Sequence, residues 1–401
     1  MTGYILEWLN FLGRWFHMIV GIAWIGASFY FIWLDSHLRT PRYPEEADRL
    51  GLSGEVWALH GGGFYRAQKF KIAPPEMPDP LHWFKWEAYT TWLSGMFLMV
   101  LIYYVQADVY LIDQRVANLT HMGAVLLGLV FLALGWIIYD VLCRTALSKN
   151  EPVFAAILFV LSGLAAYLLC SFFSGRGAFI HFGAMLGTIM AANVFFVIMP
   201  GQREMVKAKA ENRVPDPKHA ANGKLRSVHN TYFTMPVLFV MISNHYALFT
   251  NHKYNWAVLM AIALAGVLIR LYFTFKHRGN HRPWLFGGGL LILAGVFWAL
   301  RPAPVIAPPA GAASTVSYAR VAAIIEQRCA VCHAEKPSFA GFAAAPKNIL
   351  LDSKTHIATN AQSTYQQAVV LKAMPPGNLT GITDAERGVI EAWFVAGAKV
   401  E

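Results

Sequence analysis

Eight stretches of the chain are apolar over about 20 residues or more, the length that an α-helix needs to cross the hydrocarbon core of a bilayer. They cover residues 7–33, 84–105, 120–143, 152–174, 177–200, 232–250, 255–275 and 283–300. Charged residues make up only 14% of the chain, against about 25% in soluble proteins, so much of the surface must face lipid. The fold class that we predict is all-α, with a polytopic membrane helix bundle of about eight spans over residues 1–300.

Lys and Arg gather in alternate connections between these stretches. The connections rich in Lys and Arg are residues 34–82, 144–149, 201–231 and 276–282, whereas the connections between them hold few basic residues. Because Lys and Arg accumulate on the cytoplasmic side of a membrane, this pattern places both chain termini on the outer side. The net charge of +10 is explained in the same way, and nucleic acid is not expected as a partner.

The composition changes after residue 300. Residues 301–314 read RPAPVIAPPAGAAS, which predicts an extended Pro/Ala linker. Residues 315–401 then predict a small helical domain in water. Within it, Thr383 followed by Glu386 is a capping-box pattern that predicts a helix start, and Gly397 suits the end of that helix.

The domain contains the motif Cys-Ala-Val-Cys-His at residues 329–333, which is the attachment signature of c-type haem. Two thiols one helical turn apart, Cys329 and Cys332, can bond the two vinyl groups of one porphyrin, and His333 then lies under the iron as an axial ligand. The alternatives are a zinc site and a redox Cys-x-x-Cys motif. Neither a second pair of zinc ligands nor a thioredoxin-like βαβ pattern accompanies the motif, so we expect one covalent haem c.

The sixth ligand of the iron is predicted to be Met374, the only methionine after residue 300. It lies in the segment KAMPPGN, where two prolines restrict the loop that presents the sulfur. The rival ligand is His356, the other histidine of the domain. The order of helix, Cys-x-x-Cys-His, Met-Pro loop and final helix resembles a class I cytochrome c. Such domains receive haem outside the cytoplasm, in agreement with the topology from the basic connections.

Four histidines lie in the outer half of the predicted membrane region or at its edge: His17, His121, His181 and His245. Ionisable residues inside spans are costly and therefore point to function. A pair of these histidines could ligate a haem b between helices, or the group could line a substrate site. His121 could also be an interfacial residue, and His245 could cap a helix. Arg14 lies three residues before His17 and shares its helix face.

Three segments near the N-terminus carry a family resemblance: GRWFHM at residues 13–18, GIAWIGASF at residues 21–29 and HWFKWE at residues 82–87. They resemble the corresponding parts of bacterial membrane-bound urate oxidases, also called urate hydroxylases. An eight-span region joined to a C-terminal cytochrome c is the architecture of that family.

The resemblance implies that urate is oxidised by two electrons and hydroxylated by water to 5-hydroxyisourate. The electrons would leave through the fused cytochrome c to a respiratory acceptor, such as another cytochrome c or a terminal oxidase. It also implies the bacterial inner membrane, with the N-terminus and the cytochrome domain on the periplasmic side. Arg14 and His17 become the candidates for anion contact and proton handling. The alternative is a membrane-anchored cytochrome c subunit that serves another dehydrogenase, although an anchor needs only one or two spans.

Overall fold

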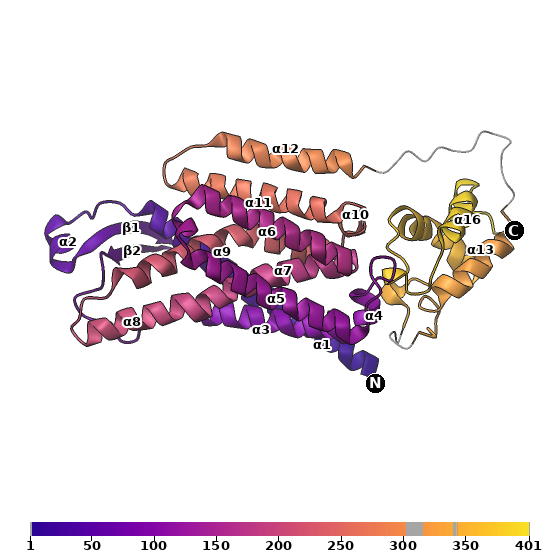
Figure 1. Ribbon diagram of the computed structural model, residues 1–401, viewed down its shortest axis with the longest axis horizontal. Helices are drawn as coiled ribbons and strands as arrows, with labels where there is room; N and C mark the ends of the chain where they lie inside the picture. Colours follow the sequence, from indigo (N-terminus) through magenta and orange to yellow (C-terminus); the bar gives the residue numbers. More distant parts are fainter. Residues whose placement is uncertain (1, 302–315, 340–341, 343, 401) are drawn as a thin grey trace.

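The computed structural model describes residues 2–301, 316–339, 342 and 344–400, and it is mostly helical (Figure 1). Nearly all of the predicted Pro/Ala linker therefore lies outside the described residues. The long helices form one bundle, and the C-terminal segment packs against one end of it.

All eight apolar stretches fall on helices of the bundle. These are α1 (Thr2–His37), α3 (Trp86–Leu98), α5 (His121–Arg144), α6 (Glu151–Phe172), α7 (Gly175–Ala192), α9 (Pro217–Ser243), α11 (Asn255–His277) and α12 (Pro283–Ala299). Turns of π-helix extend α3 through η1 (Met99–Tyr104) and join α7 through η3 (Asn193–Ile198) to α8 (Met199–Ala210). Within the described residues, five of these continuous helices are long and apolar enough to cross a membrane by length and composition, and α12 is a shorter apolar helix.

The position of each helix in the bundle determines which side chains it buries. Helix α7 packs against α5, α6 and α9 and contains many buried apolar residues, whereas α1 and α12 lie at the periphery. Ile22 on α1 is 67% exposed, and Leu291 and Phe297 on α12 are each 75% exposed. Large apolar side chains exposed in rows are compatible with a surface that meets lipid.

The all-α prediction is wrong for one part of the basic segment 34–82. After α2 (Pro44–Leu50), strands β1 (Leu52–His60) and β2 (Gly63–Phe70) form an antiparallel hairpin. Gly61 and Gly62 have φ of +56° and +80°, the left-handed conformation that a two-residue hairpin turn requires. The buried Glu55 carboxylate accepts hydrogen bonds from Arg42 N, Trp57 Nε1 and Arg66 Nε, which joins the two strands to each other and to the segment after α1.

The C-terminal segment has a small apolar core of its own, formed by Val321, Ile325, Leu351, Ile357, Ala361 and Trp393. Its helices are α13 (Tyr318–Ile325), α14 (Lys354–Thr359), α15 (Ala361–Thr364) and α16 (Asp384–Val395), with π-helical turns at η4 (Glu326–Ala330) and η6 (Tyr365–Val370). The predicted capping box is confirmed at the start of α16, because Glu386 N donates to Thr383 Oγ1 and Thr383 N donates to Glu386 Oε2.

Short elements complete the described chain: α4 (Ala107–Tyr110), η2 (Ala146–Lys149), α10 (Ala247–Thr250), η5 (Pro346–Asn348) and η7 (Pro376–Asn378). Helices α4 and α10 lie at the end of the bundle that faces the C-terminal segment, and η7 contacts α4 across that boundary. The hairpin and α8 lie at the opposite end (Figure 1).

Candidate functional site

The four residues that the sequence predicts as haem ligands and attachment points line one hollow of the C-terminal segment. Cys329, Cys332, His333 and Met374 face a space of about 610 Å³, open mouth included, which we call the CxxCH hollow. Its remaining wall is mainly apolar, with Ile349, Leu351, Ala368, Pro375 and Pro376 among the lining residues. Its size and lining are those of a site for a cofactor or another small molecule.

His333 is held in the orientation and tautomer that suit a metal ligand. Its Nδ1 lies 2.9 Å from the Ile349 carbonyl oxygen, which can only accept, so Nδ1 carries the proton. The Nε2 lone pair is then available to a metal, the arrangement found in most histidine–metal sites. Two backbone bonds fix the residue further, from His333 N to Cys329 O and from Leu351 N to His333 O.

Cys329 and Cys332 are both free thiols. Burial raises the pKa of Cys329 to about 12 and also raises the pKa of Cys332. The two groups are therefore neutral thiols at physiological pH, and Cys332 N donates to Cys329 O within a single turn. Neither group is therefore a nucleophilic thiolate in this environment.

Met374 belongs to a loop that is hydrogen-bonded to a buried arginine. Arg387 of α16 is 3% exposed, and its guanidinium donates to the carbonyl oxygens of Ala368 and Met374 and to Asn378 Oδ1. The rival ligand His356 instead forms a 2.6 Å contact with Asp352 and does not line the hollow. Sequence analysis missed Arg387, although its position three residues before the buried Ile390 marks it as a charge on the inner face of α16.

The four membrane histidines do not meet at one point. His121 and His181 both contact Tyr104, through its carbonyl oxygen and its hydroxyl respectively, while His17 contacts Ser94 Oγ at 2.9 Å. His245 is exposed just beyond the end of α9.

A haem b does not fit the pair that Tyr104 joins. His121 bonds Asp108 through its other nitrogen, and His181 bonds the Gly177 carbonyl oxygen, so all four ring nitrogens have protein partners. Within the described part of the chain, no group of three or more His, Cys, Asp or Glu side chains is arranged to hold a metal ion.

A buried polar cluster near the hairpin end of the bundle was not predicted. Arg226 is 4% exposed, and it donates to Asp140 Oδ1 at 2.7 Å and to Asn193 Oδ1 at 3.2 Å. Asn193 donates to the Tyr139 hydroxyl, which lies 2.8 Å from His229 Nδ1. The basic segment 201–231 concealed Arg226 and His229, because α9 begins at Pro217, well before the apolar stretch does. The cluster's partners satisfy one another, as a structural network between helices requires.

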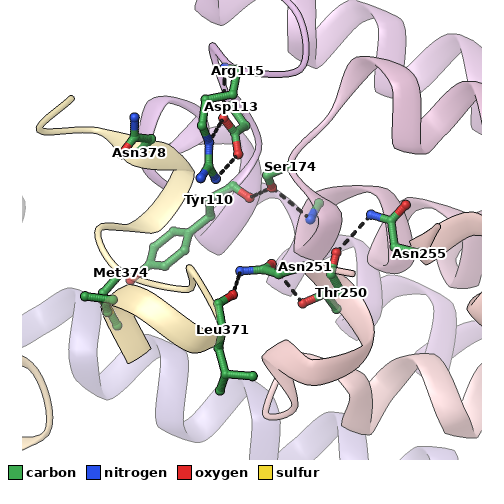
Figure 2. A network of polar contacts seen from close by, with 12 residues as sticks. Tyr110, Asp113, Arg115, Ser174, Thr250, Asn251, Asn255, Leu371, Met374 and Asn378 are labelled. Atoms are coloured by element: carbon green, nitrogen blue, oxygen red, sulfur yellow. Dashed lines mark hydrogen bonds and ion pairs between the residues drawn. The ribbon is translucent and has the colours of Figure 1, made fainter. Parts of the chain in front are cut away.

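A second hollow lies between the bundle and the C-terminal segment (Figure 2). It measures about 410 Å³ with its open mouth, and we call it the interdomain hollow. The bundle contributes Tyr110, Asp113, Arg115, Ser174, Arg176 and Asn251, and the C-terminal segment contributes Lys372, Ala373, Pro376 and Gly377. The two parts are joined beside it by a hydrogen bond from Asn251 Nδ2 to the Leu371 carbonyl oxygen.

Together, these features define a mostly helical protein with a large apolar bundle and a small C-terminal unit that carries a cofactor-sized hollow. The sequence matches the family described as "Urate oxidase N-terminal" over residues 3–301. Because this match covers most of the chain, the chain belongs to that family and is a urate oxidase-related oxidoreductase. This match confirms the coarser part of the resemblance seen in the N-terminal segments, the relation to urate oxidases. No curated protein and no solved structure matched the chain.

Proposed function

We propose that this protein is a membrane-bound urate hydroxylase that passes its electrons to a haem c in its own C-terminal domain. In the reaction, urate and water give 5-hydroxyisourate, two electrons and two protons. The observation that carries the proposal is the union, in one chain, of a urate oxidase-family bundle with a hollow lined by Cys329, Cys332, His333 and Met374.

The residues of the CxxCH hollow fit haem c. Cys329 and Cys332 would hold the porphyrin covalently, and His333 Nε2 and the Met374 sulfur would be the two axial ligands. When bound, haem c accepts and passes on one electron at a time. With this group bound, the domain would carry electrons rather than oxidise urate itself.

The shape of the molecule supports an orientation in the bacterial inner membrane with the C-terminal domain in the periplasm. The C-terminal domain and the N-terminus lie at the same end of the bundle, whereas the basic hairpin and α8 lie at the other end (Figure 1). Eight helices would span the bilayer, with the basic end in the cytoplasm. A respiratory electron acceptor, such as another cytochrome c or a terminal oxidase, would then reach the haem domain from the periplasm.

Anaerobic addition of urate to the purified, oxidised protein tests this function. We expect the absorption bands of ferrous haem c to appear without any partner protein, and we expect ¹⁸O from labelled water to enter the product. Dithionite supplies the control, because it reduces the haem in any case. If dithionite reduces the haem and urate does not, the chain is an electron carrier for another dehydrogenase.

A further inference from the structure

We propose that the interdomain hollow is the site that binds the urate anion. This inference rests on the proposed function and names the place where the substrate lies. It also predicts that the site is complete only when the C-terminal domain is seated on the bundle, since both parts supply its walls.

The first argument is the wall that the two hollows share. Pro376 lines the interdomain hollow on one side and the CxxCH hollow on the other. Two residues earlier, Met374 faces the CxxCH hollow, and Ala373 faces the interdomain hollow. The two hollows are therefore adjacent at Pro376, so a molecule in the interdomain hollow would lie beside the proposed haem site.

The second argument is charge. The lining contains three cationic side chains, Arg115, Arg176 and Lys372, and one carboxylate, Asp113. Arg115 pairs with Asp113 at 2.6 Å, and Lys372 pairs with Asp384 at 2.7 Å. For Arg176, the structure records no ion pair with any described residue, so its charge is available to an anion. Urate is an anion at neutral pH, and an arginine recognises planar oxygen and nitrogen edges well.

The third argument is Tyr110, whose ring lies at the boundary and points toward Met374 (Figure 2). Ser174 Oγ donates to the Tyr110 carbonyl oxygen at 2.7 Å, which holds the residue in place at the start of α7. Tyr110 lines the interdomain hollow together with Arg176. An aromatic face beside cationic groups suits a flat, anionic ring.

The fourth argument is the close fit at Gly377. A Cβ at this position would lie 2.5 Å from the Ile112 carbonyl oxygen of the bundle, and φ of Gly377 is +55°. Only glycine lets the loop approach the bundle this closely. The loop that carries Met374 and Pro376 is thus fitted to the bundle at the rim of the proposed site.

Urate binding to the reduced protein tests the site without turnover, because haem that is already ferrous cannot accept electrons. The experiment is equilibrium dialysis of labelled urate against the full-length, haem-loaded protein in detergent with dithionite. Arg176→Gln should weaken binding about tenfold or more, the usual effect of losing a charge-assisted hydrogen bond. Arg176→Lys should restore much of the affinity. Lys253→Gln removes an exposed charge at the same end of the bundle, outside the hollow, and should change the affinity less than about twofold.

A pair of glycine variants tests whether the site needs the seated domain. Gly377→Ala should weaken urate binding and raise hydrogen exchange in residues 107–115 and 371–378. Gly381→Ala is the matched control, because Gly381 has φ of +66° and its added Cβ would meet nothing closer than Arg328 Nη1 at 3.9 Å. It carries the same backbone strain without the clash and should leave both measurements unchanged.

The outcomes separate this inference from the proposed function. Urate affinity that is unchanged in both Arg176→Gln and Gly377→Ala, in a protein that still oxidises urate, overturns the interdomain site and leaves the function intact. If Lys253→Gln loses as much urate affinity as Arg176→Gln, the effect of Arg176 is only long-range electrostatics. That result also overturns the site. A wild-type protein that neither binds nor oxidises urate rejects the function itself.

Discussion

The two hollows on either side of Pro376 differ in what lines them. The CxxCH hollow has mainly apolar walls, with two thiols, one imidazole and one thioether facing it. The interdomain hollow is charged and is built from two parts of the chain that meet at a polar boundary. Under the two proposals above, one loop would serve two ligands. The apolar side suits a large group that is bonded once and stays, whereas the charged side suits a small anion that must enter and leave.

The first test asks whether the CxxCH hollow holds a covalently bound group. If it does not, the contrast between the two hollows fails. The double variant Cys329→Ala, Cys332→Ala should lose covalently bound haem completely, because no thiol remains in the hollow to bond the porphyrin. Acid-acetone extraction followed by a haemochrome spectrum measures this. Cys143→Ala, Cys170→Ala is the control and should keep all of its haem, since these two cysteines lie in the bundle. Equal haem content in the two double variants would reject the CxxCH assignment.

The second test concerns the thioether that faces the same hollow. Met374→Ala should leave the haem attached but lower its reduction potential, because a thioether ligand stabilises ferrous iron. His356→Ala should leave the potential unchanged, since His356 pairs with Asp352 outside the hollow. A redox titration of both variants decides the point. If only the His356 variant shifts, the sixth ligand has been assigned to the wrong residue.

The proposed haem c site could be recognised in the sequence because covalent attachment of haem demands a fixed local spacing. Cys329, Cys332 and His333 lie within five residues, and Met374 is the only methionine available. The apolar stretches likewise predicted the helices of the bundle, since a spanning helix must be apolar along its length. Both patterns involve residues close together in the sequence, so they can be recognised without the structure.

What the sequence did not reveal depends on contacts between distant segments. The hairpin at 52–70 carries polar and aromatic residues on both faces, so its strands lack a clear alternation. Arg226 looked like one more basic loop residue, because its partners Asp140 and Asn193 come from other helices. The interdomain hollow could not be foreseen for the same reason, as Arg176 and Lys372 are almost 200 residues apart.

A third test changes Arg387, whose hydrogen bonds support the loop that lines both hollows. Arg387→Gln removes hydrogen bonds to the Met374 carbonyl oxygen and to Asn378, and it leaves buried acceptors unsatisfied. We expect the C-terminal domain to lose about 2–3 kcal/mol of unfolding free energy, the usual effect for bonds to a charged group. Denaturant titration followed by haem absorbance measures the change. The exposed Arg320→Gln is the control and should cost less than about 0.5 kcal/mol.

The smallest effect should come from the start of α16, the helix that carries Arg387. Thr383→Ala removes the capping-box oxygen and should cost about 1 kcal/mol. Thr383 N and Arg328 both donate to Glu386 and hold the pKa of its carboxyl below the ordinary value. A depressed folded-state pKa gives stability that is present above the unfolded pKa, about 4.3, and is lost as the pH falls through the folded value.

Wild-type stability should therefore fall in acid over that window, and Glu386→Gln should remove this part of the pH dependence while keeping an acceptor at the helix start. Denaturant titrations between about pH 3 and pH 6 measure both effects, in the range where carboxyl groups titrate. If the wild type and Glu386→Gln show the same pH dependence, Glu386 does not contribute to the acid sensitivity of the domain. The shared loop would then owe its position to Arg387 and the core alone, and α16 would matter to the two hollows only as the support of that arginine.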